Sequence, residues 1–121
     1  MKSKLLTCFV FLCLVLTACG GNGPTTNLEV ILGDFQFTPN EFIVPAGQEI
    51  SFKAVNNGAV VHNFVIMQLG VDAGASFEDD DVTNVYWEVE LLPGADVATS
   101  FTAPSEPGEY QVICRTEGHI A

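Results

Sequence analysis

Residues 110–119 read YQVICRTEGH, and the other features of the chain are best understood in relation to this stretch. Its first half alternates between apolar and polar residues, which is the pattern of a short β-strand. Because alternate side chains of a strand share a face, Tyr110, Val112 and Cys114 form one row that points toward the core. A loop of four residues then leads to His119. The stretch therefore sets a cysteine at the inner end of a strand and a histidine shortly after it.

Other short alternating or apolar segments fill the chain before this stretch, separated by turn residues such as Pro45-Ala46-Gly47 and Asn56-Asn57-Gly58. About seven short strands with turn signals every 8–12 residues, and no convincing helix, predict an all-β protein with the architecture of a β-sandwich. The segments expected as strands are residues 28–37, 42–44, 48–55, 59–67, 85–91, 97–101 and 109–114.

Three local expectations follow from the pattern. Phe35 and Phe37 continue the apolar row of the first strand after a possible bulge at Gly33-Asp34. Residues 59–67 are apolar on both faces, which favours a central strand covered on both sides. Residues 69–84 break the rhythm and are expected to form a long loop with one helical turn.

The N-terminal region has the pattern of an export signal. Lys2 and Lys4 precede an apolar run, residues 5–16, that is too short to span a bilayer stably. The following sequence, LTAC, resembles a bacterial lipobox in which Cys19 becomes the lipidated first residue. An ordinary secretory signal is the alternative. We therefore expect a lipoprotein signal peptide at 1–18, a flexible Gly/Pro/Thr/Asn-rich tether at 19–27 and one domain at 28–121.

Only one free thiol is expected in the mature domain. Cys8 and Cys13 leave with the signal peptide, and Cys19 carries the lipid, so Cys114 has no disulfide partner. An exported protein meets an oxidising compartment, where an unpaired cysteine needs an explanation. Burial as a small hydrophobic residue and metal ligation are the two alternatives.

The charge distribution narrows the range of partners. All 15 acidic residues follow residue 18, where only Lys53 and Arg115 are basic, which leaves an excess of 13 negative charges. Such a domain does not bind nucleic acid, and an anionic membrane would repel it, so membrane attachment depends on the lipid. A cationic protein partner would be attracted. The acidic run at 78–81 lacks the pattern of a calcium loop and is either a solvated loop or a docking patch.

A second candidate ligand lies on the central strand. His62 is the only histidine besides His119, and it shares a strand face with Val60, Phe64 and Ile66. A single inward-facing histidine is more often an ordinary core residue. However, one thiolate and two imidazoles in an apolar shell form a donor set suited to copper. The two histidines and the one free cysteine all fall where one metal site can collect them.

At this point the sequence resembles the cupredoxins, a family of small blue-copper proteins. The resemblance covers about residues 28–119. The segments that carry it are HNF at 62–64 and the PGEY, Cys and Gly-His elements of 107–119, with FTP at 37–39, PAG at 45–47 and LPG at 92–94.

The resemblance implies a Greek-key β-sandwich that holds one type 1 copper ion. His62, Cys114 and His119 would be its strong equatorial ligands. Asn63 would form a hydrogen bond toward the cysteine loop and clamp the site, and the carbonyl of Val61 would lie near the metal.

The sequence departs from the family pattern in its last residues. The axial methionine of the family usually follows the second histidine and precedes a closing strand, whereas this sequence stops at Ala121. Met67 cannot replace it, because it is five residues along the strand from His62 and on the opposite face. We therefore expect the sequence to be incomplete, with the axial ligand and the C-terminal strand beyond it.

Two further departures affect the ligand loop. Arg115 stands where the family often has a small hydroxylated residue, and we expect it to raise the copper potential or to dock an acidic group of a partner. Glu117 replaces a common proline, so the loop is expected to be less rigid.

These observations predict a copper-binding electron-transfer protein, lipid-anchored in the periplasm or on the cell surface, and not an enzyme. The electron would leave through the edge of His119, across an apolar rim, to a redox protein such as a cytochrome, an oxidase or a reductase.

Four alternatives use parts of the same pattern. A copper chaperone or store would use the same ligands but usually adds methionines or histidines, and the mature domain offers only Met67. Multicopper oxidases and nitrite reductases need further histidines, and a binuclear centre needs a second cysteine in the loop. A metal-free adhesive sandwich is the last alternative.

Overall fold

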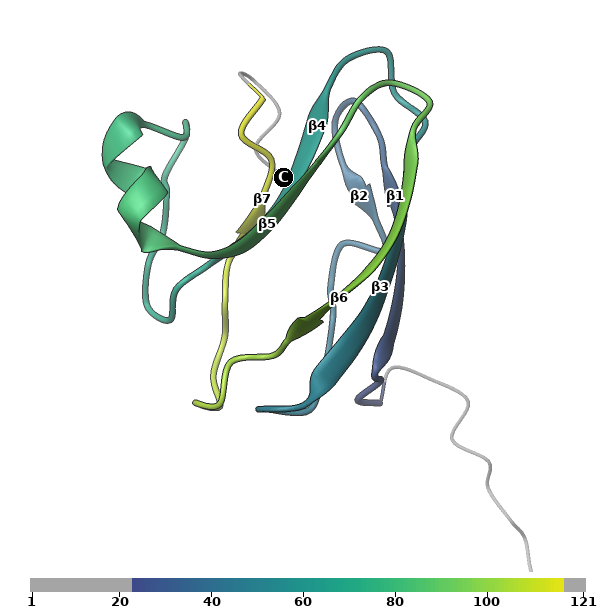
Figure 1. The fold of residues 1–121 in the computed structure, drawn as a ribbon. Helices are drawn as coiled ribbons and strands as arrows, with labels where there is room; N and C mark the ends of the chain where they lie inside the picture. Colours follow the sequence, from purple (N-terminus) through teal and green to yellow (C-terminus); the bar gives the residue numbers. More distant parts are fainter. Residues whose placement is uncertain (1–22, 117–121) are drawn as a thin grey trace, which may run out of the picture.

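The computed structural model describes residues 23–116, which fold into two β-sheets packed face to face (Figure 1). One sheet has the order β2-β1-β3-β6 and the other the order β5-β4-β7. This arrangement confirms the predicted β-sandwich. No helix within residues 23–116 has the length and apolar character to cross a membrane. The elements are β1 (Asn27–Leu32), β2 (Phe37–Thr38), β3 (Glu49–Asn56), β4 (His62–Met67), the 3₁₀ helix η1 (Asp79–Asn84), β5 (Val85–Leu91), β6 (Asp96–Thr102) and β7 (Val112–Ile113).

Alternation of apolar and polar residues decides which strand faces form the core. In β3 every second residue is buried, including Ile50, Phe52 and Ala54, while Lys53 between them is exposed. β1 shows the same pattern and runs parallel to β3, whereas β6 is antiparallel to β3 on its other side. The period of two therefore turns one row of each strand toward the opposite sheet.

Aromatic rings fill the space between the sheets. The ring of Phe64 on β4 lies 5.4 Å from Phe37, 5.4 Å from Phe42 and 4.8 Å from Phe52, measured between centroids. Trp87 packs edge-on against Phe52 at 5.2 Å. Burying a side chain of this kind stabilises a fold by roughly 1.5–3 kcal/mol, so the cluster supplies the core without a disulfide.

β4 is buried on both faces, as its apolar sequence predicts, and each face has a separate role. His62, Phe64 and Ile66 face the other sheet. Met67 and Val65 face away from it and form a second apolar cluster with Ile113, Val71, Ala73, Phe77 and Val85. Met67 therefore lies on the face opposite His62, which confirms that it cannot serve as the axial ligand.

The segment between β4 and β5 is the expected loop, and its helical part, with six residues, is longer than the single turn predicted. It contains η1, whose first turn is the acidic run: the Glu78 backbone N–H donates to the Asp81 carboxylate at 2.8 Å. The side chain of Gln111 anchors the loop, because its oxygen accepts from the Ala73 N–H at 2.8 Å and its nitrogen donates to Asp72 at 3.1 Å. The acidic run therefore caps and begins η1, and its role as a docking patch stays a prediction.

The prediction for Phe35 was wrong. Residues 33–36 form a tight turn between β1 and β2, closed by the Gly33 N–H donating to the Gln36 carbonyl at 3.0 Å. Phe35 lies at the tip of this turn and its side chain is 81% exposed. The turn breaks the alternation, so only Phe37 returns to the core row.

Several element boundaries also differ from the prediction. Residues 42–44, expected as a strand, belong to the segment between β2 and β3 and form no strand. The last strand is β7 alone and not residues 109–114, because its ladder with β4 is confined to Val112 and Ile113. The 59–67 strand begins only at His62, so Val60 lies in the preceding loop and is exposed. At the other end, Thr25 already donates a backbone hydrogen bond to Ile43 at 3.0 Å, so the ordered domain begins inside the predicted tether.

Candidate metal centre

Two of the three predicted ligands meet between the sheets. His62 is the first residue of β4 and is fully buried, and Cys114 follows β7 directly and is 1% exposed. The β4–β7 register pairs Val65 with Ile113, so Cys114 falls opposite Phe64 and His62 is its diagonal neighbour on the same face. As a result the Nδ1 atom of His62 lies 3.5 Å from the Sγ atom of Cys114.

Backbone groups hold the cysteine and the loop after it. The N–H of Asn63 donates to Cys114 Sγ at 3.3 Å. The hydroxyl of Thr116 donates to the carbonyl of Val61 at 2.6 Å, which ties the start of the ligand loop to the residue before β4. The bond from Asn63 therefore fixes the position of the sulfur, and the bond from Thr116 fixes the start of the loop.

Asn63 differs in part from its expected role. Its side-chain amide donates to Glu90 on β5 at 3.1 Å, and its contact with the cysteine comes from the backbone N–H. The residue still links β4 to the thiol, but through the main chain. The carbonyl of Val61 holds Thr116, and its proximity to a metal stays a prediction.

The second ring nitrogen of His62 has a carboxylate partner that sequence reasoning missed. Asp34 Oδ1 lies 3.0 Å from His62 Nε2 and also accepts the N–H of Ala59 at 2.9 Å. Asp34 belongs to the β1–β2 turn, 28 residues before the histidine. The Gly33-Asp34 pair was visible only as a turn signal, and nothing in its sequence indicates which loop it faces.

A buried asparagine shapes the loop that precedes His62. Asn56, at the end of β3, is fully buried and donates to the carbonyls of Val60 at 2.8 Å and Leu91 at 2.9 Å. Its side-chain oxygen accepts the N–H of Gly58 at 2.9 Å. One side chain therefore joins β3, the 57–61 loop and β5 beside the candidate metal centre.

Arg115 has partners within the domain. Its guanidinium NH2 group lies 2.5 Å from Glu88 Oε1, and its Cζ atom is 4.5 Å from the centre of the Phe77 ring. The arginine therefore joins the loop after Cys114 to Glu88 on β5 and to Phe77 in the acidic loop between β4 and β5. An acidic partner group would have to compete with Glu88 for this arginine, and both the docking role and the predicted effect on the copper potential stay predictions.

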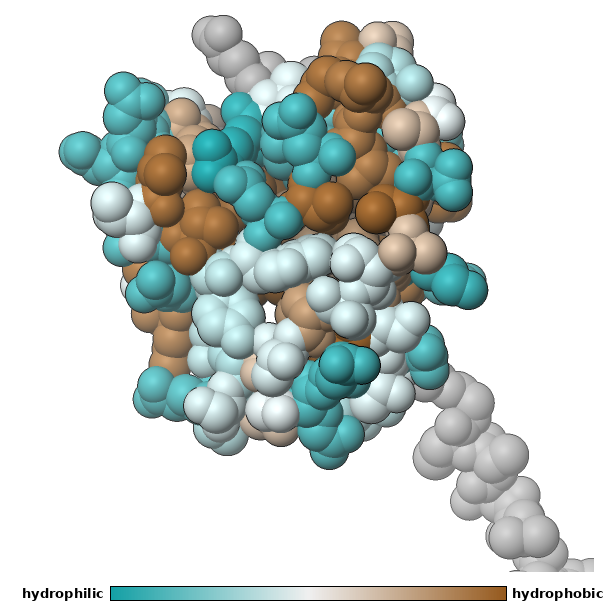
Figure 2. Space-filling view, viewed as in Figure 1, coloured by the Kyte–Doolittle hydropathy of each residue, from teal (hydrophilic) through white to brown (hydrophobic). Residues whose placement is uncertain are grey.

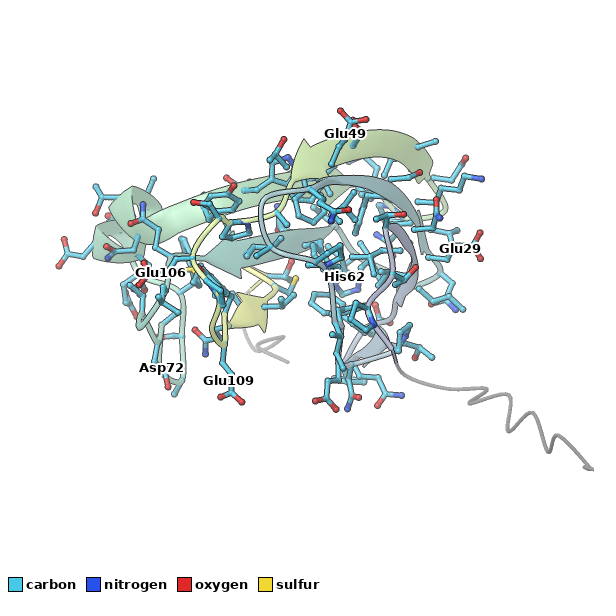
Figure 3. The ribbon with its side chains drawn as sticks, turned by 90° about the horizontal axis from the view of Figure 1, so that it is seen from below. Glu29, Glu49, His62, Asp72, Glu106 and Glu109 are labelled. Carbon is cyan, nitrogen blue, oxygen red and sulfur yellow. The ribbon has the colours of Figure 1, made fainter. Side chains whose placement is uncertain are left out.

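Acidic side chains cover much of the outside. Figure 3 shows Glu29, Glu49 and Glu109 reaching outward from the ribbon, whereas His62 lies in the interior. The candidate centre is therefore buried, while the exterior of the domain is rich in acidic side chains (Figure 3).

The end of the sandwich that contains His62 is more apolar. Figure 2 shows hydrophobic residues gathered at the upper end of the viewed face, where the 57–61 loop and the β5–β6 turn lie in Figure 1. The exposed large apolar residues of these segments are Val60 and Leu92, with exposed fractions of 41% and 63%. Phe35 lies in the adjacent β1–β2 turn, whose Asp34 contacts His62.

The donors that the structure brings together fit copper. A buried thiol and an imidazole nitrogen face each other at 3.5 Å, and thiolate with imidazole is the soft donor combination that copper prefers. His119 and Cys19 lie outside the described residues. Within residues 23–116 no three His, Cys, Asp or Glu side chains form a cluster suited to a metal. The described part of the site is therefore a pair of candidate ligands, His62 and Cys114.

The sandwich fold and this buried Cys–His pair define a copper protein of the cupredoxin class. In agreement, the sequence matches the cupredoxin-like domain family over residues 6–121, and the chain belongs to that family. Cupredoxins bind one copper ion and are electron-transfer proteins rather than enzymes.

Individual relatives agree with this assignment. Auracyanin-A of Chloroflexus aurantiacus is 28% identical over an alignment of 148 positions, which covers 98% of this chain and 91% of the relative. Plastocyanin of Mercurialis perennis is 35% identical over 96 residues, covering 72% of this chain and 85% of the relative. The crystal structure of reduced auracyanin from Roseiflexus castenholzii superposes with a TM-score of 0.66 at 31% identity, covering 80% of this chain and 90% of that one.

Proposed function

We propose that this protein is a type 1 copper electron carrier in which His62, Cys114 and His119 hold one copper ion. The observation that supports this most directly is the buried approach of His62 Nδ1 to Cys114 Sγ at 3.5 Å. A copper ion held there would accept one electron on reduction from Cu(II) to Cu(I) and would release it on reoxidation. The chain contributes a fixed thiolate, which Asn63 holds through its backbone N–H, and a dry surrounding that excludes water.

Electron transfer is favoured by a rigid arrangement of the residues that hold the metal. An electron carrier works best when its ligands move little between the two oxidation states. Here each described ligand is attached to a strand, and hydrogen bonds from Asn56 and Thr116 brace the flanking loops. Burial of both ligands also opposes the exchange of metal that a chaperone or store requires.

The partner is a redox protein such as a cytochrome, an oxidase or a reductase. The apolar end formed by Val60, Leu92 and Phe35 supports contact there, and the electron would leave through His119. The acidic exterior would attract a cationic partner and make the rate of association fall with salt.

We also propose that the protein is exported and carries a lipid on Cys19. The support comes from residues 1–19, in which Lys2 and Lys4 are followed by an apolar run and then by the sequence LTAC. This order favours the periplasm or the cell surface. Incorporation of labelled fatty acid by wild type but not by Cys19→Ser tests the anchor. Equal labelling of the two proteins rejects it.

Copper titration of the metal-free protein tests the central proposal. One equivalent of Cu(II) should produce an intense visible thiolate-to-copper band, and Cys114→Ser should abolish it. Met67→Leu is the matched control, because it removes a sulfur from the opposite face of β4 and should preserve the band. The proposal fails if wild type shows no band or if Cys114→Ser retains it.

A further inference from the structure

We propose that Asp34 is a positioning residue of the metal centre, which orients His62 and uses its negative charge to favour Cu(II) over Cu(I). This inference rests on the proposed function of the same site. It assigns a role to a turn residue that lies far before Cys114 in the chain and belongs to none of the segments that mark the family in this sequence.

The contact between Asp34 and His62 is specific in its geometry. Oδ1 lies 3.0 Å from Nε2, and the same oxygen is held by the N–H of Ala59 at 2.9 Å. An ionised carboxylate only accepts hydrogen bonds, so the ring must donate through Nε2–H. The lone pair of Nδ1 then faces Cys114 Sγ, which is the orientation that a metal ligand needs.

Gly58 shows that the loop is built around this contact. A Cβ atom on residue 58 would overlap Asp34 Oδ1 and would stand 2.7 Å from His62 Nε2. Both approaches are far closer than van der Waals contact, so any larger residue would displace the carboxylate or the imidazole. The absence of a side chain at Gly58 is therefore what allows Asp34 to reach the histidine.

The charge of the partner matters as well as its position. A backbone carbonyl could orient the ring equally well, but a carboxylate also makes the imidazole a stronger donor. The oxidised ion carries one more positive charge, so a nearby fixed anion stabilises it more than the reduced ion. Because the His62 ring is fully buried and Asp34 is only one-third exposed, solvent screens this interaction incompletely. Asp34 should therefore lower the reduction potential.

The test is a comparison of reduction potentials in the copper-loaded protein. Asp34→Asn keeps an oxygen acceptor and removes the charge. We expect it to retain the visible band and to change the ratio of Cu(II) to Cu(I) affinity by about tenfold, which raises the potential of a one-electron couple by about 59 mV. Glu49→Gln is the matched control, since it removes one charge at the far end of β3, roughly 23 Å along the strand from Asn56, and should leave the potential unchanged.

A metal-free readout separates orientation from charge. Nitrogen chemical shifts of His62, measured in the apo protein at a pH where the ring is neutral, should show the Nε2–H tautomer in wild type. Asp34→Ala removes the acceptor altogether and should yield a mixture of tautomers. A pure Nε2–H tautomer in Asp34→Ala overturns the orienting role.

Gly58→Ala provides a second variant, because its Cβ would push the carboxylate or the imidazole out of their contact without deleting either group. Its potential should rise as in Asp34→Asn. The inference is overturned if the potential of either variant equals that of wild type within the change seen for Glu49→Gln. Failure of wild type to bind copper would instead reject the proposed function, so the two failures are distinguishable.

Discussion

Removing the Asn56 side chain should weaken the whole domain, because this residue holds together three segments around the candidate metal centre. Its amide donates to Val60 and Leu91, and its oxygen accepts from Gly58, all at 2.8–2.9 Å in a fully buried position. Asn56→Ala deletes all three bonds and leaves two carbonyls and one N–H without this partner.

The magnitude follows from the number of bonds. Each intramolecular hydrogen bond contributes about 1 kcal/mol net, so three bonds amount to about 3 kcal/mol. For a domain of this size, 1 kcal/mol shifts the melting temperature by about 4–8 °C, and the expected fall is therefore about 12–24 °C. Asn56→Asp should cost at least as much, since it sets a carboxylate oxygen against two carbonyl acceptors.

Thermal and urea unfolding of the metal-free protein measure this effect. Asn57→Ala is the matched control, because Asn57 is the exposed neighbour and its side chain forms no hydrogen bond within residues 23–116. It should change the free energy of unfolding by less than about 0.5 kcal/mol. A loss below about 1 kcal/mol for Asn56→Ala, or a loss equal to that of Asn57→Ala, would refute the reasoning.

Two further predictions concern the loops. A double-mutant cycle with Glu88→Gln and Arg115→Gln should give a coupling energy of about 0.5–1 kcal/mol. Because the ion pair is partly exposed, this coupling energy should fall as salt is added. A coupling energy of zero would contradict the pairing. The pKa of the Tyr110 hydroxyl is raised above its usual 10.0. The largest cause is partial burial, followed by the nearby charges of Glu106 and Tyr86. In Tyr86→Phe, Tyr110 should therefore deprotonate above pH 10. The stability from its 2.6 Å bond to the Glu106 carbonyl should be present below pH 10 and lost at higher pH. A spectrophotometric midpoint at or below 10 would contradict this.

The sequence was sufficient for the strands whose two faces differ. β1, β3 and β5 alternate strictly, so the hydrophobic pattern alone assigns their inner rows. Strand parity also placed His62 and Cys114 on inward faces, and the structure brings these two together. For His119 the expectation stands untested, because that residue lies outside the described part of the chain.

The remaining features depend on long-range geometry. Phe35 looked like the next member of an apolar row, but a turn closed by Gly33 and Gln36 carries it out to the surface. Asp34 escaped notice for a related reason, since its partner is 28 residues away and only the folded loops bring the two together. Local pattern predicts which face a residue occupies, but not which loop it meets.

The two-sided burial of β4 has a consequence for how the family can vary. One face of the strand carries His62 toward Cys114, and the other carries Met67 against the long acidic loop. Replacing side chains of the outer cluster can therefore reshape that loop without disturbing the ligands. Adding or deleting one residue within the strand would exchange the two rows and turn the histidine away from the cysteine. We therefore expect relatives to differ freely in the length and composition of the acidic loop, while the spacing of residues 62–67 stays fixed.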